Sequence, residues 1–385
     1  GSLDLTHKVV QGDLKNGFAI IRPPGHHACK SQAMGFCLFN NVAIVAQTAI
    51  SKWNLSRVLI VDYDVHHGNG TQEIFADSNA VLYISLHRWQ QGNFFPGTGD
   101  PKYVGTDVGK GFSVNIGWNQ THMADQDYLF AFQQAVIPIA TEFKPELILV
   151  SAGFDAAQGD PHGEMNLTPA IYASMTELLM QVCSKTVVLL EGGYNLESNA
   201  KSAMAVMKEL TQDVDVDVDL EDLSLEENDK LPSLDCVEDV IATLTAQLEF
   251  WESAKQHLKL VQNFKNQNYS KQEIEKKKTA VVVVQNDTGP QSVTHLTRAS
   301  RRTAEAIWKD EIFKLERRLT ELKDKLKNID KLQKQVQRKV KLSKTELGEI
   351  GQEEAYLFEK EEIEKELKEL KSLTKEEAII MYTNS

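Results

Sequence analysis

The stretch RVLIVDYDVHHGNG at residues 57–70 decides the fold. Residues 58–61 are Val, Leu and Ile, a run typical of a strand that is buried on both faces. Asp62, Asp64 and His66 follow at every second position, so their side chains lie on one side of the strand end. Buried carboxylates need a partner, and a divalent metal with Asp and His ligands provides one. A strand end with solvated acids remains the alternative for this stretch taken alone.

Composition narrows the class of protein. A length of 385 residues predicts about two domains, of which residues 1–210 look globular and residues 258–385 are rich in Lys, Glu and Gln. The net charge of −13 argues against direct nucleic-acid binding but leaves room for a basic protein substrate. The four cysteines have no paired spacing, which suits a reducing compartment such as the cytoplasm or nucleus. We expect no signal peptide and no membrane span, because no apolar run is long enough.

Further strands are predicted to converge on the same edge of a sheet. A helix at 70–76 precedes a strand at 80–86, and this β-α-β order predicts a parallel sheet with a right-handed crossover. Later apolar runs end in Asp155 and lead into Tyr194. Because the carboxyl ends of parallel strands meet at one crevice, we expect Asp155 to join Asp64 and His66 at a metal.

Two loops are expected to line that crevice. The stretch GFAIIRPPGHHA at 17–28 presents His26 and His27, which could be a metal site, a general-base pair or surface residues. Facing Asp62, a histidine would gain a carboxylate that orients its ring. The long loop 87–111 is rich in Gly, Pro and aromatic residues, and its Phe94 and Phe95 are either loop anchors or a substrate wall.

Seven motifs in this order and spacing resemble the class II histone deacetylases of the arginase/deacetylase superfamily. The resemblance covers about residues 15–257 and implies an α/β fold, a mostly parallel open sheet with helices on both faces. It also implies a zinc-dependent protein-lysine deacetylase. The motifs are RPPGHHA (22–28), GFCLFNNVA (35–43), VDYDVHHGNGTQ (61–72), SLHR (85–88), FFPGTG (94–99), SAGFDAAQGDP (151–161) and LEGGYN (190–195).

The resemblance also implies roles for individual residues. One catalytic zinc would be bound by Asp64, His66 and Asp155. The catalytic group would comprise the tandem acid/base histidines His26 and His27, their partners Asp62 and Asn69, and the oxyanion donor Tyr194. The substrate-binding group would comprise Gly35, Phe36, Phe95 and His162, with the two phenyl rings gripping the lysine stem. A structural potassium would be bound by Asp62, Asp64, His66, Ser85 and Leu86, partly through backbone carbonyls.

Elementary chemistry agrees with these roles. Amide hydrolysis needs a polarised carbonyl, an activated water and a proton for the leaving amine. We favour His27 for the proton transfers and His26 for an electrostatic role, although the sequence does not separate them. A Tyr194 hydroxyl that hydrogen-bonds the oxyanion contributes about 3–4 kcal/mol. Some members of the class have His at this position and are poor catalysts, so Tyr194 favours real activity.

Two departures from the family pattern affect the prediction. The acetylpolyamine-hydrolysing branch has an acidic residue at the position of His162, so acetylated proteins, histones or non-histone proteins such as tubulin, are the expected substrates. Within the class, we suggest the two-domain cytoplasmic tubulin deacetylases as the most similar type.

The second departure is at the start of the chain. Only 25 residues precede His26, so we expect a domain that is N-terminally incomplete and that folds poorly or needs a partner.

The whole chain is predicted to be divided into three parts. The deacetylase domain is expected over residues 1–257, with an acidic insertion at 213–229 that holds nine acids and no base, and a last helix at 231–257. Residues 258–300 are predicted to be a linker, and residues 301–385 a helical coiled-coil region with a heptad pattern. The coil would form a homodimer or bind a helical partner, and a single solvated helix is the alternative.

Two other functions remain possible from the sequence. A catalytically impaired scaffold could bind acetyl-lysine and act through the coiled coil. An acetylpolyamine hydrolase would prefer acetylspermidine over an acetylated peptide.

Overall fold

The computed structural model describes residues 1–211 and 231–269, together with scattered positions between 319 and 371. The chain divides into two units, Gly1–Lys277 and Lys278–Ser385. The acidic insertion and nearly all of the predicted coiled coil lie outside the described residues, so both stay predictions. In the second unit, Lys323 Nζ lies 3.5 Å from Glu364 Oε1.

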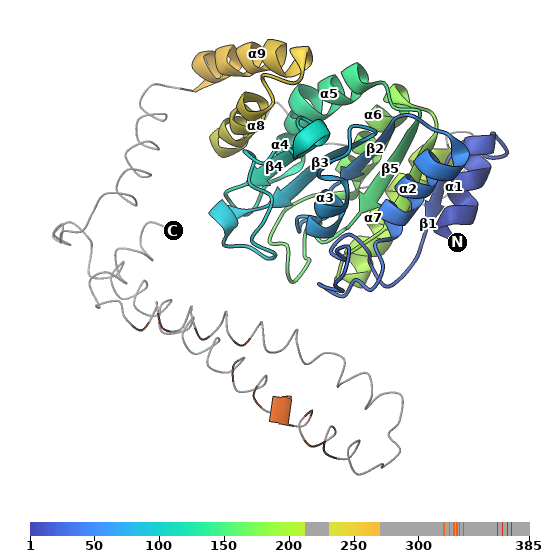
Figure 1. Cartoon of the computed structure of the whole chain (residues 1–385). Helices are drawn as coiled ribbons and strands as arrows, with labels where there is room; N and C mark the ends of the chain where they lie inside the picture. The colour runs from blue at the N-terminus through green and yellow to red at the C-terminus, as the bar shows by residue number, and fades with distance from the viewer. Residues whose placement is uncertain are drawn as a thin grey trace. The chain divides into compact units, whose positions relative to one another are not determined.

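The first unit is built on six parallel strands in the order β1-β6-β5-β2-β3-β4 (Figure 1). The chain runs outward from β2 to β3 and β4 on one side, and from β5 to β6 on the other. The carboxyl ends of β2 and β5 therefore flank a topological switch point, where ligands bind in open α/β sheets. The predicted parallel sheet is confirmed. The strands are β1 (Gly17–Ala19), β2 (Val58–Asp62), β3 (Val81–Arg88), β4 (Ser113–Trp118), β5 (Leu147–Ala152) and β6 (Thr186–Leu190).

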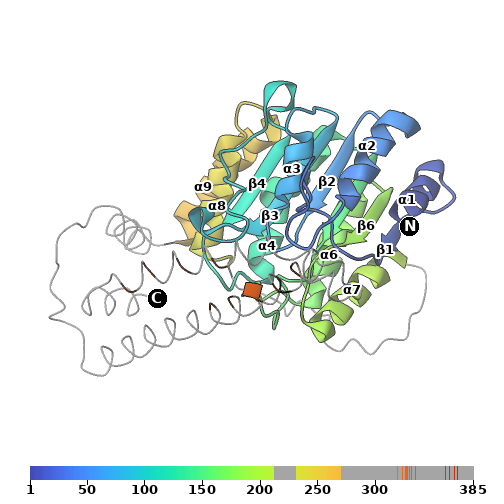
Figure 2. The ribbon, with the colours of Figure 1, turned by 60° about the horizontal axis from the view of Figure 1, so that its bottom comes forward.

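Helices cover both faces of the sheet, as predicted (Figure 2). One buried cluster packs α1, α2 and α3 against one face, and a larger one packs α4 to α9 against the other. The α-helices are α1 (Ser2–Gln11), α2 (Asn41–Trp53), α3 (Asn69–Phe75), α4 (Asp125–Ala131), α5 (Ile137–Phe143), α6 (Pro169–Val182), α7 (Leu196–Thr211), α8 (Leu234–Ala246) and α9 (Glu252–Asn268). Short helical turns lie at η1 (Gln90–Gly92), η2 (Asp107–Gly109) and η3 (Phe132–Val136), the last of them π-helical between α4 and α5.

The helix α2 illustrates how local sequence sets these elements. Asn40 precedes its first turn, and the Asn40 side chain accepts a hydrogen bond from the backbone N–H of Ala43, a typical N-cap. Val42 and Val45 lie on the apolar face that packs on the sheet. The helix ends at Trp53 and is capped by Asn54, which adopts the left-handed conformation with φ 59°. Asn40 also contacts the loop between β1 and α2, so this cap links the helix to that loop.

The expectation of one helix over residues 231–257 is wrong. The chain forms two helices, α8 and α9, and the predicted end of the domain at residue 257 falls inside α9. The break has a physical cause, because two side chains of the connecting segment bind the sheet. Gln247 Nε2 donates to the Ser113 carbonyl at 2.7 Å, and Trp251 Nε1 donates to the Gly111 carbonyl at 2.8 Å.

Within the part of the chain that the structure describes, no helix combines the length and apolar character that crossing a bilayer requires.

Candidate active site

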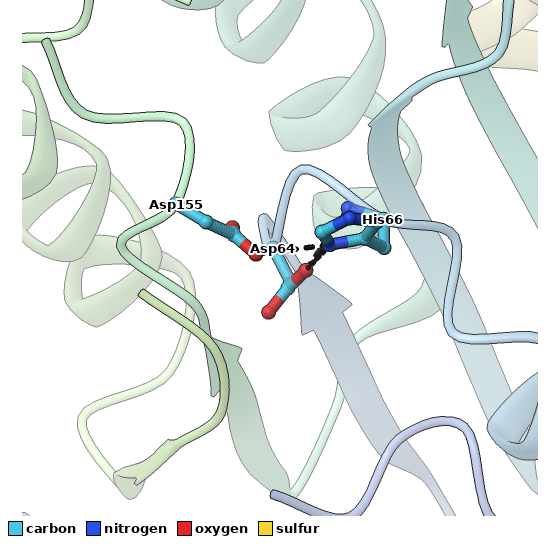
Figure 3. A group of neighbouring side chains, drawn as sticks. All are labelled: Asp64, His66 and Asp155. Atoms are coloured by element: carbon cyan, nitrogen blue, oxygen red, sulfur yellow. Dashed lines mark hydrogen bonds and ion pairs between the residues drawn. The ribbon is translucent and has the colours of Figure 1, made fainter. Parts of the chain in front are cut away.

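Three side chains converge at the carboxyl edge of the sheet (Figure 3). Asp64 and His66 follow β2, and Asp155 follows the neighbouring strand β5. His66 Nδ1 lies 2.9 Å from Asp155 Oδ2 and 3.1 Å from Asp64 Oδ1. One potential ligand atom from each residue lies within 4.8 Å of the others. The predicted juxtaposition of these three residues is therefore present, and its two oxygens and one nitrogen are donors that zinc accepts.

Backbone N–H groups fix the orientation of both carboxylates. Asp155 Oδ1 accepts from the N–H of Val65 at 2.8 Å, and Asp64 Oδ2 accepts from the N–H of Gly192 at 2.9 Å. Gly192 must be glycine, because an added Cβ would lie 2.7 Å from a carboxylate oxygen of each aspartate. These contacts leave the two acids aimed at one point, together with His66.

The electrostatics of the three residues follow from burial and mutual contact. Although burial favours the neutral imidazole, hydrogen bonds and charge from Asp155 and Asp64 raise the pKa of His66 to about 9. Burial and the charge of Asp64 raise the pKa of Asp155 to about 7. Burial acts against ionisation of Asp64, but His26 and His66 hold its pKa below the usual range. Two buried carboxylates this close favour a cation between them, so the donor set fits a divalent metal.

The tandem histidines make different contacts. His26 Nδ1 lies 3.0 Å from Asp62 Oδ2, which also accepts from the Tyr83 hydroxyl at 2.9 Å. His27 Nδ1 lies 2.8 Å from Asn69 Oδ1. The two predicted pairings are thus present as contacts, while the catalytic roles remain predictions. The rings of His26 and His27 are buried, with centroids 4.1 Å apart.

The two histidines also differ in their charge environment. Burial opposes the charge of His26, but Asp64 and Asp62 raise its pKa well above the usual value. Burial and the neighbouring rings of His26 and His66 lower the pKa of His27 well below the usual value. His27 is therefore the neutral member of the pair.

Aromatic side chains surround the histidines and Tyr194. The Phe95 ring centroid lies 5.1 Å from that of His27, and Phe36 lies 6.2 Å from Tyr194. The exposed ring of His162 meets Tyr194 edge-on at 4.9 Å. Burial and the charges of Asp64 and Asp155 raise the pKa of Tyr194, so its hydroxyl stays protonated.

Gly35 has a steric role next to these rings. Its φ is +53°, and an added Cβ would lie 2.4 Å from Cδ2 of His27. Only glycine lets the loop pass this close to the histidine ring.

The residues predicted to bind potassium are partly adjacent. Ser85 and Asp62 are register partners on β3 and β2, and Leu86 follows Ser85. Ser85 Oγ lies 2.8 Å from His87 Nδ1. Potassium binding by these groups stays a prediction.

Sequence reasoning named Phe94 without deciding its role, and it missed the roles of Arg88 and Asp160. The Phe94 ring stacks on His66 with centroids 5.1 Å apart, and the Arg88 guanidinium lies 4.3 Å from the Phe94 centroid. Asp160 accepts hydrogen bonds from the N–H groups of Tyr194 and His162. The adjacent Phe pair was a signal for Phe94, but nothing local marked Asp160, because its main partner is far away in the sequence.

The sheet order and the Asp-His-Asp set fit an α/β protein of the arginase/deacetylase fold. The chain belongs to the histone deacetylase domain family, whose domain matches residues 1–210. The predicted class II resemblance is confirmed at the level of this family.

Three curated relatives illustrate the match. The chain is 48% identical over 284 residues to "Histone deacetylase 15" of Arabidopsis thaliana, covering 69% of this chain and 48% of that protein. It is 52% identical over 207 residues to "Histone deacetylase clr3" of Schizosaccharomyces pombe, covering 52% and 30%. It is 44% identical over 260 residues to "Polyamine deacetylase HDAC10" of Mus musculus, covering 67% and 38%. The matched part is thus half or less of each of these relatives.

A solved structure supports the fold. The crystal structure of the HDA15 HD domain superposes with a TM-score of 0.62 at 47% sequence identity, covering 68% of this chain and 70% of that chain. None of the relatives named here tests the suggested likeness to tubulin deacetylases, which stays a prediction.

Proposed function

We propose that this protein is a zinc-dependent protein-lysine deacetylase that hydrolyses N6-acetyl-lysine. The observation that carries the proposal is the convergence of Asp64, His66 and Asp155 beside the buried pair His26 and His27. The family match and the histone deacetylase names of several relatives support it.

Asp64, His66 and Asp155 would bind the metal. When bound, zinc supplies a Lewis acid that polarises the acetyl carbonyl and makes water more acidic. Potassium near Asp62 and Ser85 would add structural charge compensation, and it belongs to the same proposal.

His27 is the proposed general base. Its Nδ1 faces Asn69 Oδ1, which can only accept, so the proton sits on Nδ1 and Nε2 keeps a free lone pair. The amide of Asn69 is oriented by its own donors, since Asn69 Nδ2 lies 3.4 Å from Cys29 Sγ and 3.5 Å from Met34 Sδ. His27 Nε2 would take a proton from the attacking water, and His26 would supply positive charge.

The proposed reaction needs only water as a co-reactant. The water oxygen forms a bond to the acetyl carbon, and the bond from that carbon to the lysine nitrogen breaks. The proton taken by His27 passes to the leaving nitrogen, which gives acetic acid and the lysine amine. The acid then loses its proton and the amine takes one up, so the products are acetate and the lysine ammonium group. The Tyr194 hydroxyl would donate to the carbonyl oxygen as it gains charge.

The surroundings favour a neutral, apolar acyl-lysine. Phe36 and Phe95 offer phenyl rings on which a butyl stem without charge can lie. His162 offers no carboxylate to a cationic polyamine, so acetylated protein is the proposed substrate even though some relatives are named polyamine deacetylases.

We extend the proposal to the partners and the location of the protein. Acetylated histones or non-histone proteins such as tubulin would be substrates in the nucleus or cytoplasm, with no direct binding of nucleic acid. The C-terminal heptads would form a homodimer or bind a helical partner.

Turnover of an acetyl-lysine peptide by the full chain tests the proposal. We expect hydrolysis that a zinc chelator abolishes and added zinc restores, and a higher kcat/KM for the peptide than for acetylspermidine. Peptide binding without chelator-sensitive turnover would favour the scaffold instead. A preference for acetylspermidine would favour the polyamine hydrolase.

A further inference from the structure

The histidine loop, residues 20–29 between β1 and α2, carries His26 and His27 but has no regular secondary structure. Some of its carbonyl groups are bound by neighbouring elements. The Thr71 N–H donates to the His26 carbonyl at 3.1 Å, and Asn40 Nδ2 donates to the Ala28 carbonyl at 3.2 Å. The N–H side of the loop needs a separate partner, because buried donors are almost always satisfied.

Glu191 is that partner. It follows β6, and only 6% of its surface is exposed. Glu191 Oε2 accepts from the N–H of Gly25 at 2.6 Å and from the N–H of His26 at 3.2 Å. Glu191 Oε1 accepts from the Ser151 hydroxyl of β5 at 3.0 Å. One side chain therefore links the histidine loop to the two strands that precede Asp155 and Tyr194.

The backbone at Gly25 leaves the loop little freedom to relax. An added Cβ there would lie 2.5 Å from the backbone N of Asn41 and 2.9 Å from the carbonyl of Phe39. The loop is therefore packed against the start of α2 on one side and bound to Glu191 on the other.

We propose that Glu191 is a positioning residue that fixes His26 and His27 relative to the metal ligands. The inference rests on the proposed deacetylase function, since only then does the placement of these histidines affect a reaction. Glu191 is not in the ligand set and would act through the backbone of the loop.

Placement rather than charge is the role that the contacts support. Burial raises the pKa of Glu191, and although His26 opposes this, the net pKa is about 7. Either protonation state keeps all three hydrogen bonds, because a proton on Oε1 can be donated to Ser151 Oγ while Oε2 still accepts. Glutamine can make the same set with its oxygen toward the loop and its amide toward Ser151.

The kinetic test compares Glu191→Ala with Glu191→Gln in the zinc-loaded full chain. We expect Glu191→Ala to lower kcat about 100-fold with KM within about threefold, because a displacement of about 1 Å is enough for such a loss. Glu191→Gln should keep kcat within about threefold of wild type. Equal loss in both variants, or near-normal kcat in Glu191→Ala, overturns the proposal.

Glu146 offers a matched control at the opposite edge of the sheet. Its Oε2 also accepts two consecutive N–H groups, those of Ser56 at 2.6 Å and Arg57 at 2.9 Å. We expect Glu146→Ala to keep wild-type kcat.

Hydrogen exchange provides a readout that does not need turnover. Amide exchange at Gly25 and His26 should become faster in Glu191→Ala and stay slow in Glu191→Gln, while Glu146→Ala should affect only Ser56 and Arg57. Unchanged exchange at Gly25 and His26 in Glu191→Ala overturns the proposal. If wild type shows no turnover, the proposed function fails, but the exchange comparison still decides whether Glu191 fixes the loop.

Discussion

The candidate site has two regions: a floor, which comprises Asp62, Asp64, His66 and Asp155, and an entrance, which comprises Phe36, His162 and Tyr194. Asp64 and Asp155 on the floor are fully buried, whereas Phe36 at the entrance exposes 71% of its surface. Floor carboxylates accept several hydrogen bonds from backbone and side chains. Entrance residues meet mainly through rings 4.9–6.2 Å apart. The floor is thus preorganised for chemistry, while the entrance can vary with the substrate at little cost to the fold.

The largest effect is expected on the floor, from Asp155→Asn. Replacing this proposed carboxylate ligand by a neutral amide should remove most of the bound zinc. The proposed Lewis acid contributes more to the rate than one proton-transfer group does. We expect turnover to fall more than about 10⁴-fold, beyond the range of a general acid or base. Elemental analysis measures the bound zinc, and hydrolysis of an acetyl-lysine peptide measures the turnover.

Asp239→Asn is the matched control for that change. Asp239 is also a buried acid, bound to the N–H and side-chain amide of Asn119, away from the floor. This variant should keep one zinc per chain and wild-type turnover. An Asp155→Asn protein with stoichiometric zinc and normal activity would remove Asp155 from the ligand set.

Next in size is His27→Gln, which separates the proposed proton-transfer group from the proposed metal ligands. We expect kcat to be about 10³-fold lower, with zinc retained.

Asn69→Ala keeps the imidazole of His27 but removes the group that orients it, so a smaller loss of kcat, about 10–100-fold, is expected. His257→Gln on α9 should have wild-type kcat, since His257 contacts Gln134 instead. A larger loss in Asn69→Ala than in His27→Gln would contradict the assignment.

The floor was easier to predict from sequence than the contacts that support it. Asp64 and His66 alternate after one apolar strand and Asp155 ends another, and parallel pairing forces such ends together. Glu191 also follows an apolar strand and Asp160 lies in one of the motifs, but neither pattern identifies the group that the side chain binds. Their partners, Gly25 and Tyr194, become neighbours only through the order of the folded strands.

Helix boundaries were predicted less well for a similar reason. Apolar periodicity continues across residues 231–257, so the sequence favours one helix. The break between α8 and α9 comes from long-range hydrogen bonds of Gln247 and Trp251 to the residues around the start of β4. Helix α1, which the sequence did not predict, is bound to α2 by stacking of His7 on Trp53 at 4.9 Å. The apolar periodicity of the sequence gives no information about either contact.

At the entrance, Phe36→Ala should raise KM for an acetyl-lysine peptide about tenfold and change kcat little. Losing a phenyl contact with the lysine stem costs roughly 1.5 kcal/mol, which corresponds to about one decade in affinity. Because the Phe36 side chain is exposed, the thermal stability of the Phe36→Ala variant should stay near that of wild type. Phe39→Ala, with 73% exposure three residues away, is the matched control and should keep its KM. Equal effects of the two changes would remove Phe36 from the substrate wall.

The smallest effect is expected from His162→Glu, which adds a negative charge to the entrance without touching the floor. A carboxylate there would attract the free amine of acetylspermidine. Exposed charge pairs contribute about 0.2–1 kcal/mol, so kcat/KM for acetylspermidine relative to acetyl-peptide should rise by up to about fivefold. The rise should shrink as salt increases, because charges are screened over about 8 Å at physiological ionic strength. His162→Gln also removes the ring that meets Tyr194, but it adds no charge, so it should leave the ratio unchanged. If His162→Glu and His162→Gln shift the ratio of the two kcat/KM values equally, the ring contact with Tyr194 rather than charge determines selectivity. The entrance would then be coupled to the reaction at the floor.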